Sequence, residues 1–387
     1  GVKADAIERG EDREAFKDTM KKLQIPVPRS EICFSEDEAL SVAKKLGYPV
    51  VIRPAYTMGG TGGGIAYNNE ELLVLAQRGI NASLIHQVLI EEAVIGWEEL
   101  ELEVVRDEKN QKITVCFIEN IDAMGVHTGD SFCVAPMLTV PEALQKKMQD
   151  LSYKIVEAIG VVGGTNIQFA HNLKDDRLVA IEINPRTSRS SALASKATGF
   201  PIARVSTKLA AGLNLEEIPY WRKGTLEKYE PWGEYVVIKF ARWAFEKFRQ
   251  AKDILGTQMK AVGEVMSIAK SFKEAFQKSI RSLEIGRYGL GFAKDFNNLP
   301  LEELKSRLAY PSSERVFLMY EALRKGLSVD ELYNLTYIGK WFIKEMKEMV
   351  EFEQDLLKSG WQKLSDESLR KAKEWGFSDK YLAKIFK

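Results

Sequence analysis

Hydrophobic and polar positions follow two different patterns along this chain, and the pattern changes near residue 285. Before that point, helix-type spacing alternates with short runs that are β-branched or alternate strictly, as strands do. These runs predict strands at 48–53, 88–92, 99–105, 112–119, 165–170 and 178–184. From Pro300 onward, apolar residues recur at helical spacing, as in the stripe from Trp341 to Leu357, and strand signals are few. The pattern predicts an α+β domain over 1–285 and an all-α helical domain over 286–387.

A glycine-rich run, PAYTMGGTGGG, directly follows the predicted strand 48–53. Glycines let a loop bring backbone N–H groups close to phosphate oxygens, because no Cβ blocks the approach. The run is not a P-loop, because no Gly-Lys-Ser/Thr follows it, and it is not a GxGxxG fingerprint. Arg53, at the end of the strand, adds a cation suited to a phosphate. Two interpretations stay open, a phosphate-binding loop and a mobile surface loop.

A second group of polar residues lies on the strand 178–184 and its predicted hairpin partner. The two-residue period puts Glu182, Asn184 and Arg186 on one face, and a hairpin with 165–170 can bring Gln168 across from Glu182. Glu, Gln and Asn offer oxygen atoms, which select Mg²⁺ or Mn²⁺ over zinc or copper. Arg186 and Arg189 would then lie beside a transferring phosphate. The alternative is a solvated polar strand face.

Histidine and cysteine offer little further chemistry. His127 lies in a turn-rich loop, whereas His86 and His171 are expected at the surface, and no pair has the spacing of metal ligands. The three cysteines form no CxxC and no Cys–His motif, so neither zinc nor a cysteine nucleophile is expected.

Composition excludes several partners. Lys plus Arg equals Asp plus Glu, 55 each, so no long-range attraction to nucleic acid or to an anionic membrane is expected. No apolar run approaches the ~20 residues needed to cross a bilayer, and the cysteine usage is that of reduced thiols in a cytoplasmic protein. The chain does not begin with Met, so it is expected to be processed or to be a piece of something longer.

Three long segments resemble one known family. Residues 53–64 (RPAYTMGGTGGG), 120–131 (NIDAMGVHTGDS) and 184–201 (NPRTSRSSALASKATGFP) are similar to the carbamoyl phosphate synthetase large chain. The likeness extends over the whole chain. The sequence of residues 120–131 and the helical segment resemble the first, carboxyphosphate-forming half of the large chain. The resemblance implies an ATP-grasp fold, in which two subdomains hold ATP, followed by a helical oligomerisation domain.

The resemblance also implies roles for individual residues. Phosphate contacts are implied at Arg13, Arg53, Gly59 and Gly60. Contacts with adenine and ribose are implied at Glu92, Val94 and Glu99, and a loop lining the nucleotide is implied at Gly125, Val126 and His127. Metal ligands are implied at Gln168, Glu182 and Asn184, of which Gln168 and Glu182 also meet the nucleotide. Positions near bicarbonate and carboxyphosphate are implied at Arg186 and Arg189.

The implied reaction is phosphorylation of bicarbonate by ATP with Mg²⁺ or Mn²⁺, followed by reaction with ammonia to give carbamate, for pyrimidine and arginine biosynthesis. In the family, ammonia comes from a glutaminase small chain, and the second synthetase half completes the product. Compared with the family, this chain is expected to lack that second half, the N-terminal domain and the allosteric domain. Two other interpretations stay open: an ATP-grasp ligase acting on a different carboxylate, and an inactive fragment that serves as a nucleotide-binding or assembly module.

Overall fold

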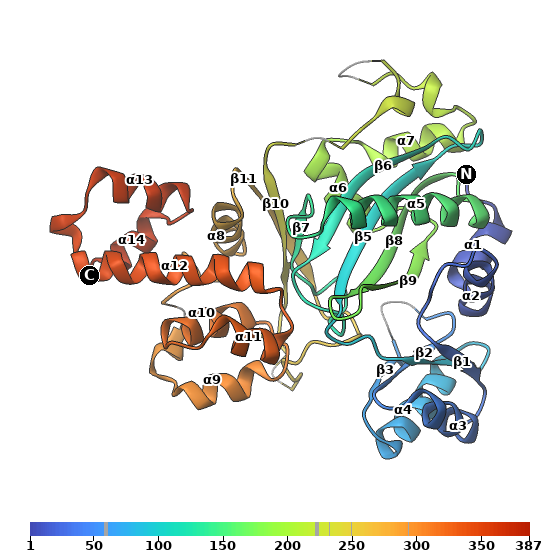
Figure 1. Ribbon diagram of the computed structural model, residues 1–387, viewed down its shortest axis with the longest axis horizontal. Coiled ribbons are helices and arrows are strands. Elements are labelled where there is room, and N and C mark those ends of the chain that lie inside the picture. The colour runs from blue at the N-terminus through green and yellow to red at the C-terminus, as the bar shows by residue number, and fades with distance from the viewer. Residues whose placement is uncertain (58–60, 221–223, 232, 249, 293) are drawn as a thin grey trace. The chain divides into compact units, whose positions relative to one another are not determined.

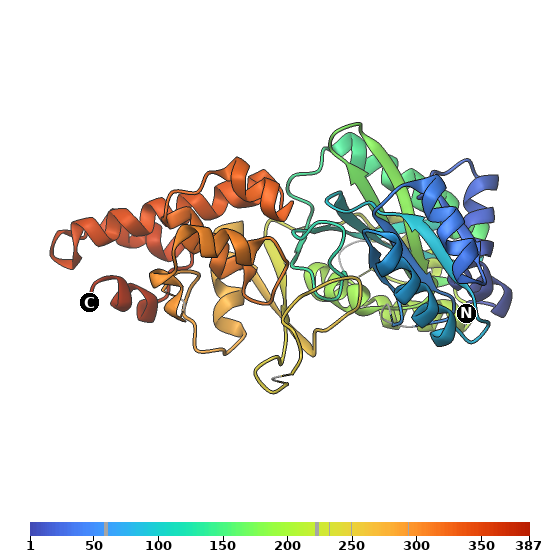
Figure 2. The same ribbon diagram turned by 90° about the horizontal axis from the view of Figure 1, so that it is seen from below.

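The computed structural model describes residues 1–57, 61–220, 224–231, 233–248, 250–292 and 294–387 (Figures 1 and 2). The chain forms two compact units. The first unit comprises Gly1–Glu119, Pro136–Trp232 and Gly256–Met259. The second unit comprises Asn120–Ala135, Gly233–Leu255 and Lys260–Lys387.

A small antiparallel sheet lies in the first unit, with the strand order β1-β4-β2-β3. Its strands are β1 (Ser30–Cys33), β2 (Val50–Pro54), β3 (Gly64–Ala66) and β4 (Val88–Glu92). Helices α3 (Glu36–Leu46) and α4 (Asn69–Ala82) pack against it and share its apolar core (Figure 1). The Ser35 side chain caps α3, and Gly47 ends that helix with a φ of 81°.

A larger antiparallel array in the first unit has the order β6-β5-β8-β9. Its strands are β5 (Glu98–Arg106), β6 (Lys112–Asn120), β8 (Gly163–Asn172) and β9 (Arg177–Asn184). Leu100, Leu102 and Val104 of β5 point into a core that includes the buried side of α5 (Glu142–Ile159), which lies over these strands (Figure 1). Helices α1 (Ala4–Glu11) and α2 (Arg13–Lys22) border the same core.

The other face of β5 carries Glu101 and Glu103, and it is covered rather than solvated. Helix α6 (Arg189–Thr198) packs there, with α7 (Ile202–Ala210) against β8. Ser190 and Ser191, in the first turn of α6, donate hydroxyl hydrogen bonds to Glu101 and Glu103, each at 2.8 Å. The strict alternation in 99–105 therefore separates an apolar core from a buried polar layer.

The second unit contains three strands in the order β11-β10-β7 and a helical region. The strands are β7 (Cys133–Ala135), β10 (Val236–Arg242) and β11 (Gly263–Ala269). Helix α8 (Phe272–Ser282) packs on β10 and β11. The helices that follow are α9 (Leu301–Leu308), α10 (Arg315–Arg324), α11 (Val329–Thr336), α12 (Lys340–Ser359), α13 (Asp366–Glu374) and α14 (Asp379–Ile385).

The predicted helical stripe forms the buried side of α12, which runs alongside α10 and α11 in both views (Figures 1 and 2). Phe342, Met346 and Met349 are buried, whereas Trp341 and Leu357 at the edges stay 37% and 39% exposed. The Phe342 ring centroid lies 5.3 Å from that of Phe272 in α8. The later helices thus share a core with α8. Within the described part of the chain, no helix has the length and apolarity needed to span a membrane.

Candidate functional site

The predicted hairpin is confirmed, and it brings the expected metal ligands together in the first unit. Strands β8 and β9 pair antiparallel with Gln168 opposite Glu182 and Asn166 opposite Asn184. A β-bulge follows directly, since Phe169 pairs with Ala180 and Ile181 has no partner position. Ile181 and Ile183 are buried, so the polar side chains of Glu182 and Asn184 share the other face.

Two arginines converge on the Glu182 carboxylate. Arg13, the first residue of α2, donates from Nη1 to Oε2 at 3.2 Å, and Nη1 of Arg53, near the end of β2, lies 3.5 Å from the same oxygen. Arg53 Nε also lies 3.1 Å from Oε1 of Glu91. Burial opposes the charge on Arg53, but the carboxylates of Glu91, Glu182 and Glu99 prevail and raise its pKa. Two cations and a carboxylate thus meet where the small sheet reaches β9.

The donors around Glu182 fit a hard divalent cation. Gln168, Glu182 and Asn184 present amide and carboxylate oxygens from neighbouring positions on two paired strands. The Glu182 side chain keeps 25% of its surface exposed, so a ligand can reach it. In the described ranges, no group of three His, Cys, Asp or Glu residues could hold a metal ion.

The other two candidate arginines lie just beyond β9. The exposed Arg186 donates from Nη2 to Oδ1 of Asn184 at 3.1 Å, and its Nε lies 3.6 Å from Oε1 of Glu11. Arg189 is exposed at the first position of α6, after the N-cap Ser188. Both side chains therefore follow the proposed metal ligands directly along the chain.

The segment implied in adenine and ribose contacts is held by a clamp that the sequence did not reveal. Arg29 binds the Glu92 carboxylate through Nε at 2.8 Å and through its backbone N–H at 2.9 Å. Arg177, at the start of β9, takes both oxygens of the same carboxylate and lies over the Trp97 ring, 5.3 Å from its centroid. Both Glu92 oxygens are therefore engaged. This clamp, formed by Arg29 and Arg177 on Glu92, fixes the segment 92–97 against the start of β9. Val94, between Glu92 and Trp97, is buried, and Glu99 is buried in β5.

A buried polar layer extends from this site along β5 and β8. Asn166 Nδ2 donates to both Glu101 and Glu103, each at 3.0 Å. Burial raises the pKa of the fully buried Glu103 carboxyl to about 8, although hydrogen bonds from Ser191 and Asn166 oppose this shift. In the sequence, only the alternating glutamates of 99–105 indicated this layer. The spacing of residues did not predict that serines of α6 would bind these glutamates.

The glycine-rich run divides into two parts. Gly59 and Gly60, the implied phosphate contacts, lie outside the described residues. Gly62 has a φ of +77°, and a Cβ there would lie 2.7 Å from the Ala82 Cβ on α4. A Cβ on Gly64 would lie 2.8 Å from Leu75. These two glycines are therefore required by close packing against α4, whatever the loop binds.

The loop with Gly125, Val126 and His127 belongs to the second unit. His127 Nδ1 accepts a hydrogen bond from the Gly129 N–H at 2.9 Å. The loop is anchored by Asp130, whose carboxylate accepts from the Trp243 indole at 3.0 Å and from two backbone N–H groups. This contact network gives Asp130 a structural role in shaping the loop.

The expectation that His171 lies at the surface was wrong. The residue is 5% exposed, with Nδ1 2.7 Å from Glu98 and Nε2 2.9 Å from Asp176. The hydrogen bond with Glu98 raises the pKa of His171, and that with Asp176 adds to the shift, against the opposing effect of burial.

The three cysteines are buried, and burial raises the pKa of the Cys33 and Cys116 thiols, so neither has the character of a nucleophile.

Two family models match this chain. The model described as carbamoyl-phosphate synthase L chain, ATP binding domain, matches residues 12–218. The model described as carbamoyl-phosphate synthetase large chain, oligomerisation domain, matches residues 264–387. The first match contains Arg13, Arg53 and every proposed metal ligand.

Individual relatives agree. The chain is 53% identical over its full length to the carbamoyl phosphate synthase large chain of Archaeoglobus fulgidus, of which it spans 36%. It is 48% identical over its full length to the carbamoyl phosphate synthase large chain, N-terminal section, of Aquifex aeolicus, of which it spans 69%. The chain therefore corresponds to about a third of the undivided large chains it matches and to most of the separate N-terminal section.

A solved structure supports the fold. The biotin carboxylase domain of Hydrogenobacter thermophilus 2-oxoglutarate carboxylase, in complex with MgADP, ADP and bicarbonate, is similar with a TM-score of 0.58 and 16% identity. The similarity covers 88% of this chain and 75% of that one. The predicted α+β ATP-grasp fold followed by a helical segment is confirmed, and with residues 12–218 and 264–387 both matched by its models, the chain belongs to the carbamoyl-phosphate synthase large-chain family.

Proposed function

We propose that this chain is the carboxyphosphate-forming part of a carbamoyl phosphate synthetase. It would bind Mg-ATP and bicarbonate and transfer the γ-phosphoryl group to a bicarbonate oxygen. The observation that carries the proposal is the meeting of Arg13, Arg53 and Glu182, beside Gln168 on the paired strand, within the segment that matches the family's ATP-binding domain.

The transfer would form a bond between bicarbonate oxygen and the γ-phosphorus and break the bond to the β–γ bridging oxygen, with ADP leaving. Catalysis of this step rests on positioning and charge stabilisation. Arg13 and Arg53 would turn from Glu182 towards the phosphate oxygens, and Arg186 and Arg189 would hold the bicarbonate and the carboxyphosphate. Ammonia would then attack the carboxyl carbon and displace phosphate, giving carbamate.

Gln168, Glu182 and Asn184 would hold the Mg²⁺, or Mn²⁺ in its place. When bound, this ion neutralises charge on the nucleotide phosphates. The two arginines on Glu182 support this role, because they show that the carboxylate attracts positive charge at this position.

The remaining residues would hold the nucleotide. The clamp of Arg29 and Arg177 on Glu92 supports a fixed backbone at Glu92 and Val94 for the adenine, with Glu99 for the ribose. Gly125, Val126 and His127 would line the nucleotide, and Gly59 and Gly60 would contact its phosphates. Exclusion of water from the bound phosphates would protect carboxyphosphate, which water otherwise hydrolyses.

The partners would be a glutaminase small chain that supplies ammonia and the second synthetase half. Residues 286–387 would act as an oligomerisation domain rather than in catalysis, which the match of 264–387 to the family's oligomerisation model supports. The reaction would serve pyrimidine and arginine biosynthesis in the cytoplasm.

Bicarbonate dependence of ADP formation tests the proposal. The chain alone, and the chain with its missing domains supplied, should form ADP faster with bicarbonate than without it. Nucleotide binding without bicarbonate-dependent turnover under both conditions would identify an inactive nucleotide-binding or assembly module. Stimulation by another carboxylate in place of bicarbonate would identify a different ATP-grasp ligase.

A further inference from the structure

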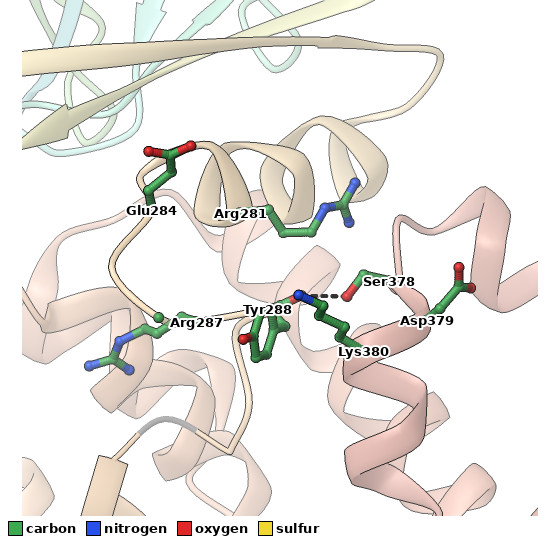
Figure 3. Close-up of a pocket in the computed structure, with 8 residues that line it drawn as sticks. Arg281, Glu284, Arg287, Tyr288, Ser378, Asp379 and Lys380 are labelled. Carbon is green, nitrogen blue, oxygen red and sulfur yellow. Dashed lines mark hydrogen bonds between the residues drawn. The ribbon is translucent and has the colours of Figure 1, made fainter.

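The second unit contains an open pocket far along the chain from the proposed ATP site. It lies between the end of α8, the segment 284–288 and the start of α14 (Figure 3). Its volume is about 430 Å³, within the range of about 300–1,000 Å³ typical of small-molecule sites. Five of the eight residues that line it carry charged side chains, so a charged ligand suits it.

Two cations face the same space in this pocket. Figure 3 shows the guanidinium of Arg281 above Ser378 and the Lys380 side chain running towards Tyr288, and the Lys380 ammonium lies 5.1 Å from the centroid of the Tyr288 ring. Arg281 donates from Nη1 to the backbone carbonyl of Gly376, a neutral acceptor. Among the ion pairs formed by the described residues, none includes Arg281 or Lys380. Burial lowers the pKa of Arg281, although Glu274 and Asp379 oppose the shift, so the site holds a partly desolvated charge without a direct carboxylate partner.

The carboxylates that border the pocket do not neutralise these cations directly. Asp379 lines the pocket but pairs with Lys373, which is not among the lining residues, at 2.8 Å. The Glu284 carboxylate points away from Arg281 and Lys380 (Figure 3). The Lys384 ammonium adds positive charge on the ring of Tyr288, 5.0 Å from its centroid.

Arg287 belongs to the wall of the pocket rather than to its charged centre. Its guanidinium stacks 3.7 Å from the Phe317 ring centroid and pairs with Glu314 at 3.3 Å. It points away from Arg281 and Lys380 in Figure 3. The cations available to a ligand are therefore Arg281 and Lys380, with Lys384 nearby.

We propose that this pocket binds a phosphate group, either as free inorganic phosphate or as part of a phosphorylated small molecule. A guanidinium presents parallel N–H donors that match phosphate oxygens, and an ammonium adds a compact charge. Phosphate would give Arg281 and Lys380 a direct anionic partner, which neither has among the described ion pairs. Ser378 would border the ligand, with its hydroxyl kept on the Tyr288 carbonyl at 3.1 Å.

Hydrogen exchange of the full chain, kept saturated with Mg-ADP so that the proposed nucleotide site is filled, tests the proposal. The probes are inorganic phosphate, ribose 5-phosphate and ribose. We expect both phosphates, and not ribose, to slow exchange in 281–288 and 376–382. Protection at a lower concentration of ribose 5-phosphate than of inorganic phosphate would identify a phosphorylated small molecule as the ligand, and the reverse order would identify the free anion.

Matched variants separate a built site from general surface charge. Lys380→Gln should weaken phosphate binding about ten-fold, whereas Lys363→Gln, which removes the same charge from an exposed position outside the pocket, should leave it unchanged. Arg281→Gln should also weaken binding, but it removes a hydrogen bond to Gly376. Lys380→Gln removes only a contact 5.1 Å from the Tyr288 ring centroid, so it is the decisive variant. Absence of protection by either phosphate, or equal loss in Lys380→Gln and Lys363→Gln, would overturn the proposal.

Discussion

At the scale of single residues, Glu182 is the position on which the proposed site depends most. Its carboxylate is the meeting point of Arg13 and Arg53 and lies opposite Gln168 on the paired strand. Glu182→Gln removes the charge but keeps the shape, so the metal and both arginines lose a common partner. We expect turnover of Mg-ATP to fall at least about 100-fold, or about 2.7 kcal/mol of transition-state stabilisation.

The control for this prediction is Glu108→Gln, which removes a carboxylate from an exposed turn. Both variants should keep the thermal unfolding midpoint of the unaltered chain to within a few degrees, roughly the shift that a 1 kcal/mol change produces. Near-normal turnover of Glu182→Gln at saturating Mg²⁺ would show that Glu182 is not a metal ligand.

Arg177 illustrates a residue that acts through another. It binds both oxygens of Glu92 and covers Trp97, so Arg177→Gln should loosen the segment expected to contact adenine. We expect KM for ATP to rise about ten-fold with kcat changed less than about two-fold, because the phosphate end of the site is untouched. Arg177→Lys should be intermediate, since an ammonium keeps the charge but not the two-donor geometry. An unchanged KM, or an equal loss in kcat, would show that the clamp does not position the nucleotide.

His171 makes folding stability depend on pH. Its folded pKa is raised above the ordinary value of 6.5, chiefly by the hydrogen bond with Glu98. A raised pKa means that the folded state binds the proton more tightly, so this stabilisation is complete below about pH 6.5 and is lost as pH rises through the folded pKa. We expect His171→Gln to lower the free energy of unfolding by about 1–2 kcal/mol at pH 6 and by much less at pH 9.

Chemical denaturation at the two pH values measures this difference. His86→Asn serves as the control, because His86 is exposed and has a φ of 52°, which asparagine tolerates. A loss in His171→Gln that is independent of pH, or that grows towards pH 9, would contradict the assignment.

At the scale of elements, hydrophobic periodicity predicted six strands and the apolar stripe of α12. It missed five further strands of the described chain, β1, β3, β7, β10 and β11, and it did not predict what covers the strands. The strand 88–92 was predicted with its observed bounds, and β5 differs from its prediction by one residue at each end. The bulge after Gln168 and the serines of α6 that bind Glu101 and Glu103 depend on tertiary contacts, which periodicity does not contain. His171 was misplaced for the same reason, since its carboxylate partner Glu98 is 73 residues away in sequence.

An ion pair joins α10 to the segment 120–135 inside the second unit. Arg315 and Asp122 are each 3% exposed and are linked through both guanidinium Nε and Nη2, with Nε 2.6 Å from Oδ1. Removing one partner leaves a buried charge, so Asp122→Asn should lower the free energy of unfolding by about 3–5 kcal/mol. Asp330→Asn, at an exposed position, should change it little.

A double-variant cycle checks this interpretation. Asp122→Asn combined with Arg315→Gln should cost less than the sum of the two single changes, because the second change removes the charge that the first leaves unpaired. Additive losses, measured by denaturant unfolding, would show that the pair does not join these elements energetically.

At the scale of the whole molecule, the resemblance of a few long segments identified the family, and the family models confirmed it. Without the resemblance, the sequence predicted only an oxygen-donor metal site and a glycine-rich phosphate loop. Arg13 and the Arg29–Arg177 clamp on Glu92 were not predicted, because their partners are distant in sequence. The chain spans 36% of the Archaeoglobus fulgidus large chain, so its reaction is proposed as one part of a longer sequence of steps. The rest of the synthetase would receive the carbamate and complete the product.

The central claim is that bicarbonate, rather than water, accepts the γ-phosphoryl group. Incubation of the chain with Mg-ATP, ammonia and oxygen-18 bicarbonate, followed by mass analysis of the phosphate released, tests it most directly. Displacement of phosphate by ammonia breaks the carbon–oxygen bond, so each phosphate should carry one oxygen from bicarbonate, and Glu182→Gln should release little phosphate. Phosphate that carries no bicarbonate oxygen would show that water attacks ATP and would contradict the account.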